Sequence, residues 1–149
     1  MNKYFLALLF SINTTFAYEV AVPKYSLDFL LNYALAKKNQ NYNPKIQKPT
    51  YHFASTTPLV QFQDAIETQW GMRPDLITNA FAVNNNEVYI LDEAAYYKKH
   101  NRCIDDSIVH ELVHYVQVKY LNWDLHDESL EWDAVEIQSQ FREEFCKTE

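Results

Sequence analysis

The chain has 149 residues, of which 48% are hydrophobic, and its formal net charge at pH 7 is −7. This length suits one domain with a single hydrophobic core. An acidic chain without a basic stripe is a poor ligand for nucleic acids and anionic membranes, so we expect neither as a partner. The composition thus argues against the nucleic-acid-binding class and leaves enzymes and binding domains open.

Residues 1–17 have the pattern of a cleaved secretory signal. Lys3 gives a short positive region, residues 4–12 are apolar, and the segment ends in small side chains that suit signal peptidase. The apolar run is too short for a comfortable membrane span, and no later stretch is apolar enough to form one. We expect cleavage near Ala17, a mature domain of residues 18–149 in the periplasm or the medium, and no stable membrane insertion afterwards. An ordinary N-terminal helix is the alternative.

The next part of the chain alternates helical and extended patterns. Residues 26–38 repeat apolar side chains at helical spacing behind a serine, a good N-cap residue. Residues 39–48 are polar and predict a loop, whereas the β-branched and aromatic residues of 49–55 predict a strand. Residues 56–69 predict a second helix, with a proline near its first position.

A β-hairpin and a short helix are expected after that. Residues 77–83 and 87–91 have strand character, and the three asparagines between them tolerate the left-handed backbone of a hairpin turn. Residues 70–75 contain a glycine and a proline and predict a turn before the hairpin. Residues 92–100 predict a short helix that leads to the central motif.

The central motif lies in residues 104–117, which have an apolar stripe at helical spacing and acidic N-cap candidates at their start. They contain His110-Glu111-Leu112-Val113-His114, of the form H-E-x-x-H. Residues four apart lie one turn above each other on a helix, so the two histidines can bind one zinc ion. Glu111 can then reach a water on the open side of that metal. Both intervening residues are apolar, as expected if the far side of the helix is buried.

A catalytic zinc ion usually takes three protein ligands, so a third must come from elsewhere. A helix is expected over residues 128–145, and residues 120–127 connect it to the motif. A histidine six residues past the second one, as in another class of zinc peptidases, is absent because position 120 is tyrosine. The candidates that remain open are His126, Asp127, Glu128, Glu131, Asp133 and Glu136. Residues 131–134 have the form E-x-x-A.

The pairing of H-E-L-V-H with a downstream E-x-x-A helix resembles the gluzincins, zinc metallopeptidases with two histidines and one glutamate as ligands. It more closely resembles small secreted bacterial members with H-E-L-V-H-x-x-Q followed by E-x-x-A-x-x-x-Q. The matching residues are His110, Glu111, Leu112, Val113, His114, Gln117, Glu131, Ala134 and Gln138. The resemblance implies that His110, His114 and Glu131 hold Zn²⁺ and that Glu111 is the general base.

One position departs from the family pattern. Many gluzincins place an acidic residue just after the alanine, where it orients a zinc-bound histidine, and this chain has Val135. Asp133 and Asp106 are the candidates to replace it. Gln117 should lie on the face that carries both histidines, where it orients a ligand or packs against the last helix.

The resemblance also implies an α+β, zincin-like fold in a single domain. A small mixed sheet or hairpin would lie beside the motif helix, with the glutamate-bearing helix at the C-terminal end. The edge strand of that sheet would pair with an extended substrate, and residues 87–91 are the natural candidate. A hairpin that only builds the core is the alternative. A further donor should stabilise the oxyanion, and the candidates are His126, Tyr120 and Tyr115.

The two cysteines, Cys103 and Cys146, flank the motif helix and the last helix. An oxidising compartment favours a disulfide between them, and buried free thiols or zinc ligands are the alternatives.

Taken together, the sequence predicts a secreted zinc metallopeptidase that hydrolyses a peptide or protein substrate. One alternative is a non-catalytic zincin-like module that recognises a peptide or a cell-envelope component. The other is a secreted structural domain in which the motif is a coincidence.

Overall fold

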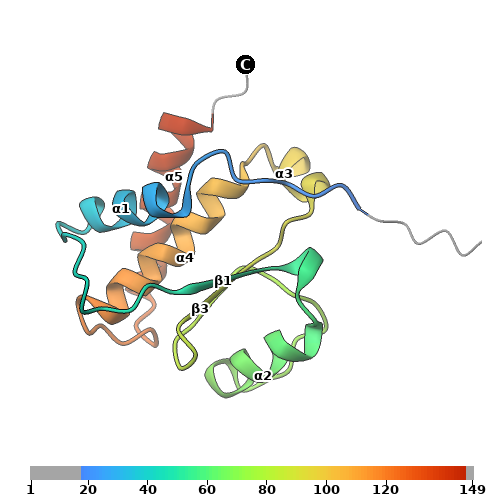
Figure 1. The fold of residues 1–149 in the computed structure, drawn as a ribbon, viewed down its shortest axis with the longest axis horizontal. Coiled ribbons are helices and arrows are strands. Elements are labelled where there is room, and N and C mark those ends of the chain that lie inside the picture. The colour runs from blue at the N-terminus through green and yellow to red at the C-terminus, as the bar shows by residue number, and fades with distance from the viewer. Residues whose placement is uncertain (1–17, 147–149) are drawn as a thin grey trace, which may run out of the picture.

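The computed structural model describes residues 18–146, so the predicted signal segment lies outside the described residues. Five α-helices and a three-stranded sheet make up an α+β domain (Figure 1). The elements in chain order are α1 (Leu27–Lys37), β1 (Thr50–Phe53), α2 (Leu59–Trp70), β2 (Ala80–Ala82), β3 (Glu87–Ile90), α3 (Ala94–His100), α4 (Ile104–Lys119) and α5 (Ser129–Phe145). The α+β class is confirmed, and each predicted helix is present with ends close to those predicted.

Local chemistry explains where several elements begin and end. The Ser26 hydroxyl accepts a hydrogen bond from the backbone N–H of Phe29 at 3.2 Å, which makes it the predicted N-cap of α1. Gly71 ends α2 with φ of 70°, a left-handed conformation that glycine adopts without strain. Asn86, at φ of 56°, supplies the same conformation at the end of the hairpin loop.

The order of strands in the sheet is β1-β3-β2. β3 pairs in parallel with β1 and antiparallel with β2, so it is the central strand. The prediction that residues 87–91 form a substrate-binding edge strand is therefore wrong. The hairpin pairing was visible in the sequence, but the return of β1 to the other side of β3 was not. The edge strand beside the motif helix is β2, at Ala80–Ala82.

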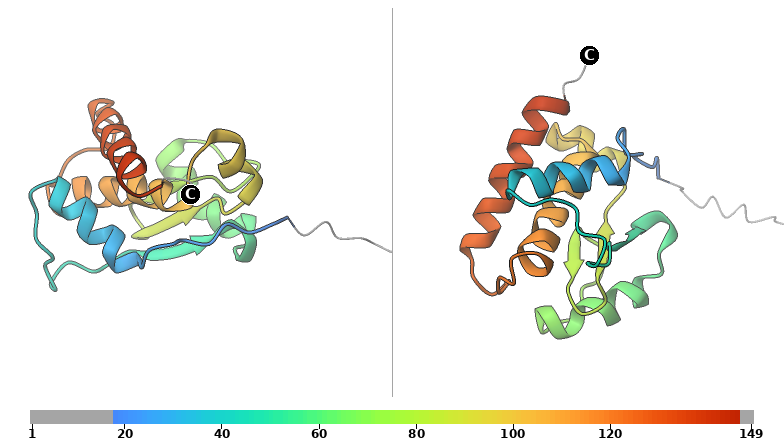
Figure 2. Two further views of the ribbon diagram at one scale, coloured as in Figure 1. Left: turned by 90° about the horizontal axis from the view of Figure 1, so that it is seen from above. Right: turned by 60° about the vertical axis from the view of Figure 1, so that its left-hand side comes forward.

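The sheet separates two hydrophobic clusters, because successive strand residues face opposite sides. Phe81, Val88 and Ile90 face the larger cluster, which they share with α1, α4 and α5. Ala80, Ala82 and Tyr89 face the smaller cluster, beneath α2. Helix α4 packs against α1, α5 and the sheet, as Figures 1 and 2 show. The motif helix is thus at the centre of the fold.

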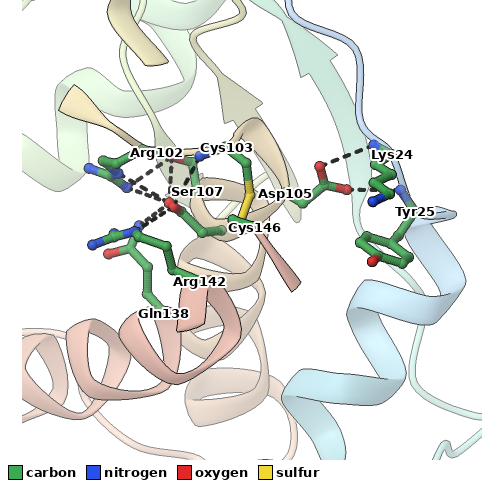
Figure 3. The surroundings of a disulfide bond; sticks show 10 residues. Lys24, Tyr25, Arg102, Cys103, Asp105, Ser107, Gln138, Arg142 and Cys146 are labelled. Atoms are coloured by element: carbon green, nitrogen blue, oxygen red, sulfur yellow. Dashed lines mark hydrogen bonds and ion pairs between the residues drawn. A yellow bond between two sulfur atoms is a disulfide. The ribbon is translucent and has the colours of Figure 1, made fainter. Parts of the chain in front are cut away.

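Burial on α4 agrees with the predicted pattern, since Leu112 and Val113 are both fully buried. The two aspartates near its start act differently from each other. Asp106 accepts a hydrogen bond from the backbone N–H of Cys103 at 3.3 Å and so caps the helix. Asp105 instead accepts from the backbone N–H groups of Lys24 and Tyr25, at 3.0 and 2.9 Å. It ties the N-terminal segment to α4, as Figure 3 shows.

Cys103 and Cys146 form a disulfide that joins the start of α4 to the end of α5 (Figure 3). The carboxylate of Asp106 is fully buried beside it and accepts hydrogen bonds from Arg102, Gln138 and Arg142 at 2.8, 3.0 and 2.7 Å. Asp106 is therefore occupied at this end of the helix pair. The suggestion that it orients a metal-bound histidine is wrong.

Within residues 18–146, no helix has the length and apolar character needed to cross a membrane.

Candidate metal centre

Two histidines on α4 and one glutamate on α5 meet where these helices pack together. The Nε2 atoms of His110 and His114 are 3.1 Å apart. The two carboxylate oxygens of Glu131 lie 3.3 Å from His110 Nε2 and 3.1 Å from His114 Nε2. One ligand atom from each of the three residues thus falls within 4.8 Å of the others. This group could hold a metal ion, and its two imidazoles and one carboxylate match the ligand types of zinc.

The other candidates for the third ligand are engaged elsewhere. Asp133 accepts from Lys38 Nζ at 2.6 Å, and Glu136 accepts from Gln140. Asp127 accepts from the backbone of Ser129, at the start of α5. His126 pairs with Asp124 at 2.7 Å, and Glu128 precedes α5 as its N-cap residue. Among the six candidates, Glu131 alone contacts both histidines in the part of the chain that the structure describes.

Gln117 determines which nitrogen of His114 faces the cluster. The amide nitrogen of Gln117 donates to Leu130 O at 3.0 Å and to Asp133 Oδ2 at 2.8 Å, two groups that accept. Its oxygen must then face His114 Nδ1, which lies 2.8 Å away and donates to it. In neutral His114 this leaves the lone pair on Nε2, directed at His110 and Glu131. A metal ion needs that tautomer.

The support behind His114 continues through Asp133 to Lys38, whose Nζ lies 2.6 Å from the carboxylate. Asp133, one of the two residues predicted to replace the acidic residue missing at Val135, contacts Gln117 and is linked to His114 only through that glutamine. His110 has no such support. Its buried Nδ1 atom lacks a hydrogen-bond partner within residues 18–146. A hydrogen bond therefore fixes the Nδ1 side of the His114 ring but not that of the His110 ring.

We expect Gln117→Ala to weaken zinc binding roughly 10- to 100-fold, because His114 loses the group that sets its tautomer and ring orientation. Competition with a chelating dye measures the affinity. Gln138→Ala is the matched control, since Gln138 is also a buried glutamine between α4 and α5 but bonds to Asp106. An equal loss of affinity in both variants would mean that general loosening of the helix pair, rather than His114 orientation, is responsible.

Glu111 lies in the same cavity as the three cluster residues. The cavity has a volume of about 320 Å³ and is lined by Gln69, Trp70, Asn79, Ala80, Phe81, His110, Glu111, His114, Leu125, His126 and Glu131. The Glu111 residue is only 5% exposed. Burial raises the pKa of its carboxyl, although His110, His114 and a backbone hydrogen bond from Phe81 act to lower it. A carboxylate with a raised pKa is suited to accept a proton.

The contact between Glu131 and His114 shifts the pKa values of the two side chains in opposite directions. Hydrogen bonds from His110 and His114 hold the pKa of the Glu131 carboxyl well below its usual range. Burial acts to lower the pKa of His114, but its hydrogen bond to Glu131 and its contacts with Glu111 and Gln117 outweigh burial, and the net shift is upward. A proton on His114 therefore competes with a metal ion for Nε2.

Two of the three oxyanion candidates point elsewhere. The Tyr115 hydroxyl donates to Gln47 O at 2.9 Å, and the Tyr120 hydroxyl accepts from the backbone of Asn43 at 3.3 Å. Neither tyrosine lines the cavity, so those two suggestions are wrong. His126 does line the cavity, at its exposed rim.

Sequence reasoning missed the cavity wall made by Gln69, Trp70 and Asn79. These residues lie near the end of α2 and before β2, where no motif marks them. The amide of Gln69 donates to Phe81 O and accepts from Val83 N, both at 3.0 Å. Lys119 Nζ donates to Val83 O at 3.2 Å. Side chains therefore occupy the outer edge of β2 where an extended peptide would otherwise pair.

No family model, curated protein or solved structure matches this chain. The case for a function therefore depends on the cluster of His110, His114 and Glu131, and on Glu111 beside it.

Proposed function

We propose that the protein is a zinc metallopeptidase of the gluzincin type with a zincin-like fold. The convergence of His110, His114 and Glu131 is the observation that carries this proposal. These residues are far apart enough in sequence that only the packing of α4 on α5 brings the glutamate to the histidines. A small mixed sheet packed on the motif helix, with the third ligand on the following helix, supports the zincin-like fold.

The number of ligands favours a catalytic site over a structural one. Structural zinc sites are closed by four protein ligands, whereas catalytic sites have three and leave a position for water. Within the described residues the cluster has three, and the Glu131 side chain is 60% exposed at a cavity of about 320 Å³. A peptide group can therefore reach the position that the protein leaves free.

When bound there, zinc would supply Lewis-acid chemistry, making water more acidic and drawing electron density from a carbonyl oxygen. Glu111 would accept a proton as water attacks the carbonyl carbon of the peptide. It would return that proton to the nitrogen as the C–N bond breaks, so that an acid and an amine leave. Its burial and position in the cavity suit this role. Gln117 would hold His114 in the tautomer that keeps its Nε2 lone pair available.

We also propose that the protein is exported to the periplasm or the medium. The disulfide between Cys103 and Cys146 supports this location, because cytosolic reductants keep most thiols reduced.

The zinc content of the purified, oxidised mature chain tests the site. We expect one zinc per chain in the wild type and none in His114→Ala or Glu131→Ala, measured at about pH 8, where the proton on His114 competes least. The control is Glu136→Ala, which removes an exposed carboxylate five residues further along the same helix. Absence of zinc in the wild type, even after supplementation, would exclude the metallopeptidase. Zinc in Glu131→Ala but not in His114→Ala would assign the third ligand elsewhere.

A mixed peptide library then separates cleavage from binding alone. A zinc-loaded protein that hydrolyses no member of the library would be a binding module rather than a peptidase.

A further inference from the structure

The outer edge of strand β2 lies beside the metal centre. β2 is at one end of the strand order β1-β3-β2 and pairs with β3. Its middle residue, Phe81, lines the cavity that contains the cluster, and the Phe81 backbone bonds to the Glu111 carboxylate. The backbone at the edge of a sheet is a template on which another extended chain can pair. A peptide bound along β2 would therefore pass the metal centre.

Three side chains already bind the backbone groups of this edge. The Gln69 amide nitrogen donates to Phe81 O, and the Gln69 amide oxygen accepts from Val83 N, both at 3.0 Å. Glu111 accepts the backbone hydrogen bond from Phe81, and Lys119 Nζ donates to Val83 O at 3.2 Å. Residues two apart on a strand direct their backbone groups to the same edge. Gln69 thus makes hydrogen bonds that the backbone of an added strand would otherwise make.

The packing of α2 places Gln69 at this edge. Ile66, three residues before Gln69 on the same helix, is fully buried in the smaller hydrophobic cluster. The ring of Trp70, the next residue, packs edge-to-face against buried Phe62 with the ring centres 5.7 Å apart. Contacts on both sides of Gln69 therefore anchor the last turn of α2 and hold the amide against β2.

The blocked part of the edge lies on one side of the metal centre. Glu111 bonds to the backbone of Phe81, and the Gln69 contacts continue from Phe81 O to Val83 N. In the other direction, the Asn79 side chain bonds back to the sheet, where its oxygen accepts the backbone N–H just after β3 at 2.8 Å. It does not cap the edge. A bound peptide can therefore extend towards Asn79 but meets Gln69 in the direction of Val83.

We propose that Gln69 is a specificity-determining residue that limits how far the substrate extends on one side of the cleaved bond. A peptide backbone that continued to Val83 would have to displace the Gln69 amide, and it would only replace hydrogen bonds that already exist. The preferred substrates are then peptides with about two residues or fewer on the blocked side, since Val83 is two residues from Phe81. This inference rests on the proposed peptidase function and names its substrate class by length.

The test uses two series of peptides that share one cleavable bond. One series is lengthened by single alanines before the bond, and the other is lengthened after it. The ratio of kcat/KM for the longest and shortest peptides does not depend on the fraction of active protein, so a partly misfolded variant still reports it. For the zinc-loaded wild type we expect this ratio to fall to about one tenth in one series, the blocked series, and to stay at one or above in the other.

Variants of α2 show whether Gln69 causes the fall. Gln69→Ala should raise the ratio of the blocked series to one or above, because the peptide backbone gains the freed groups of β2. Gln69→Glu keeps the shape but cannot donate to Phe81 O, so it should raise the ratio in part. Gln63→Ala is the matched control and should keep the wild-type ratio. Gln63 is also a half-buried glutamine of α2, but its amide donates to Pro74 O at 2.9 Å and does not line the metal cavity.

Binding provides a second measurement that does not need catalysis. Calorimetry with Glu111→Gln should show tighter binding of the shortest peptide of the blocked series than of the longest, and the difference should vanish in Glu111→Gln/Gln69→Ala. Cleavage with the same ratios in the wild type and Gln69→Ala would overturn the role of Gln69 and leave the peptidase standing. Length discrimination in binding that depends on Gln69, without any cleavage, would overturn the peptidase and support the role of Gln69. Neither cleavage nor length discrimination would overturn both.

Discussion

Replacing Glu111 with glutamine is expected to lower kcat/KM for peptide hydrolysis by about 10²- to 10⁴-fold and to leave zinc binding intact. Glutamine has nearly the same shape and can still accept the backbone hydrogen bond from Phe81, but it cannot take a proton from water. Glu111 is not part of the ligand cluster, so the metal should stay. The measurement is the rate of cleavage of one peptide, with zinc content determined on the same sample.

The thermal stability of Glu111→Gln shows whether a loss of activity comes from misfolding. Burial raises the pKa of Glu111, which means that the fold disfavours its charged form. Glutamine removes that charge, so the thermal midpoint of the metal-free variant should be no lower than that of the wild type. A large loss of activity together with a lower midpoint would point to misfolding. Activity within a few-fold of the wild type, with zinc bound, would remove Glu111 from the mechanism.

Loss of the disulfide should have the largest effect on stability. The bridge closes a loop with a sequence separation of 43 residues. In the loop-entropy model, opening such a loop lowers the free energy of unfolding by about 4 kcal/mol. We therefore expect the double variant Cys103→Ser/Cys146→Ser to unfold on the order of 10–20 °C below the wild type. Thermal unfolding should be followed in the presence of a chelator, because bound zinc would stabilise the folded state and mask part of the difference.

The local surroundings of the bridge allow a matched comparison. Asp106 bonds to Arg142 and Gln138 of α5 and so holds the same two helix ends without a covalent bond. Arg142→Ala in the disulfide-bonded chain should be much less destabilising than loss of the bridge, because the loop stays closed in the unfolded chain. A loss below about 1 kcal/mol in the double variant would show that these hydrogen bonds suffice and that the unfolded chain is already compact.

Much of the fold could be predicted because its signals are local. Apolar side chains at helical spacing marked α4 and α5, the cap residue at position 26 marked the start of α1, and the asparagines before β3 marked the hairpin. Neighbouring residues determine these features, so a single sequence contains them. Pairing between distant strands has no local signal. The position of β3 at the centre of the sheet depends on β1, some forty residues earlier, and for that reason its expected edge position was wrong.

The candidate site likewise combines features that local sequence determines with features that depend on long-range packing. By itself the sequence determined that His110 and His114 share one face of a helix and that Glu111 lies beside them, because helical geometry fixes residues so close together. For the third metal ligand, the sequence left six candidate residues. Only the packing of α5 on α4 selected Glu131, turned Gln117 towards His114 and brought Gln69 to the edge of β2. Those contacts join segments whose relative positions are set by burial of the whole core, which no local pattern encodes.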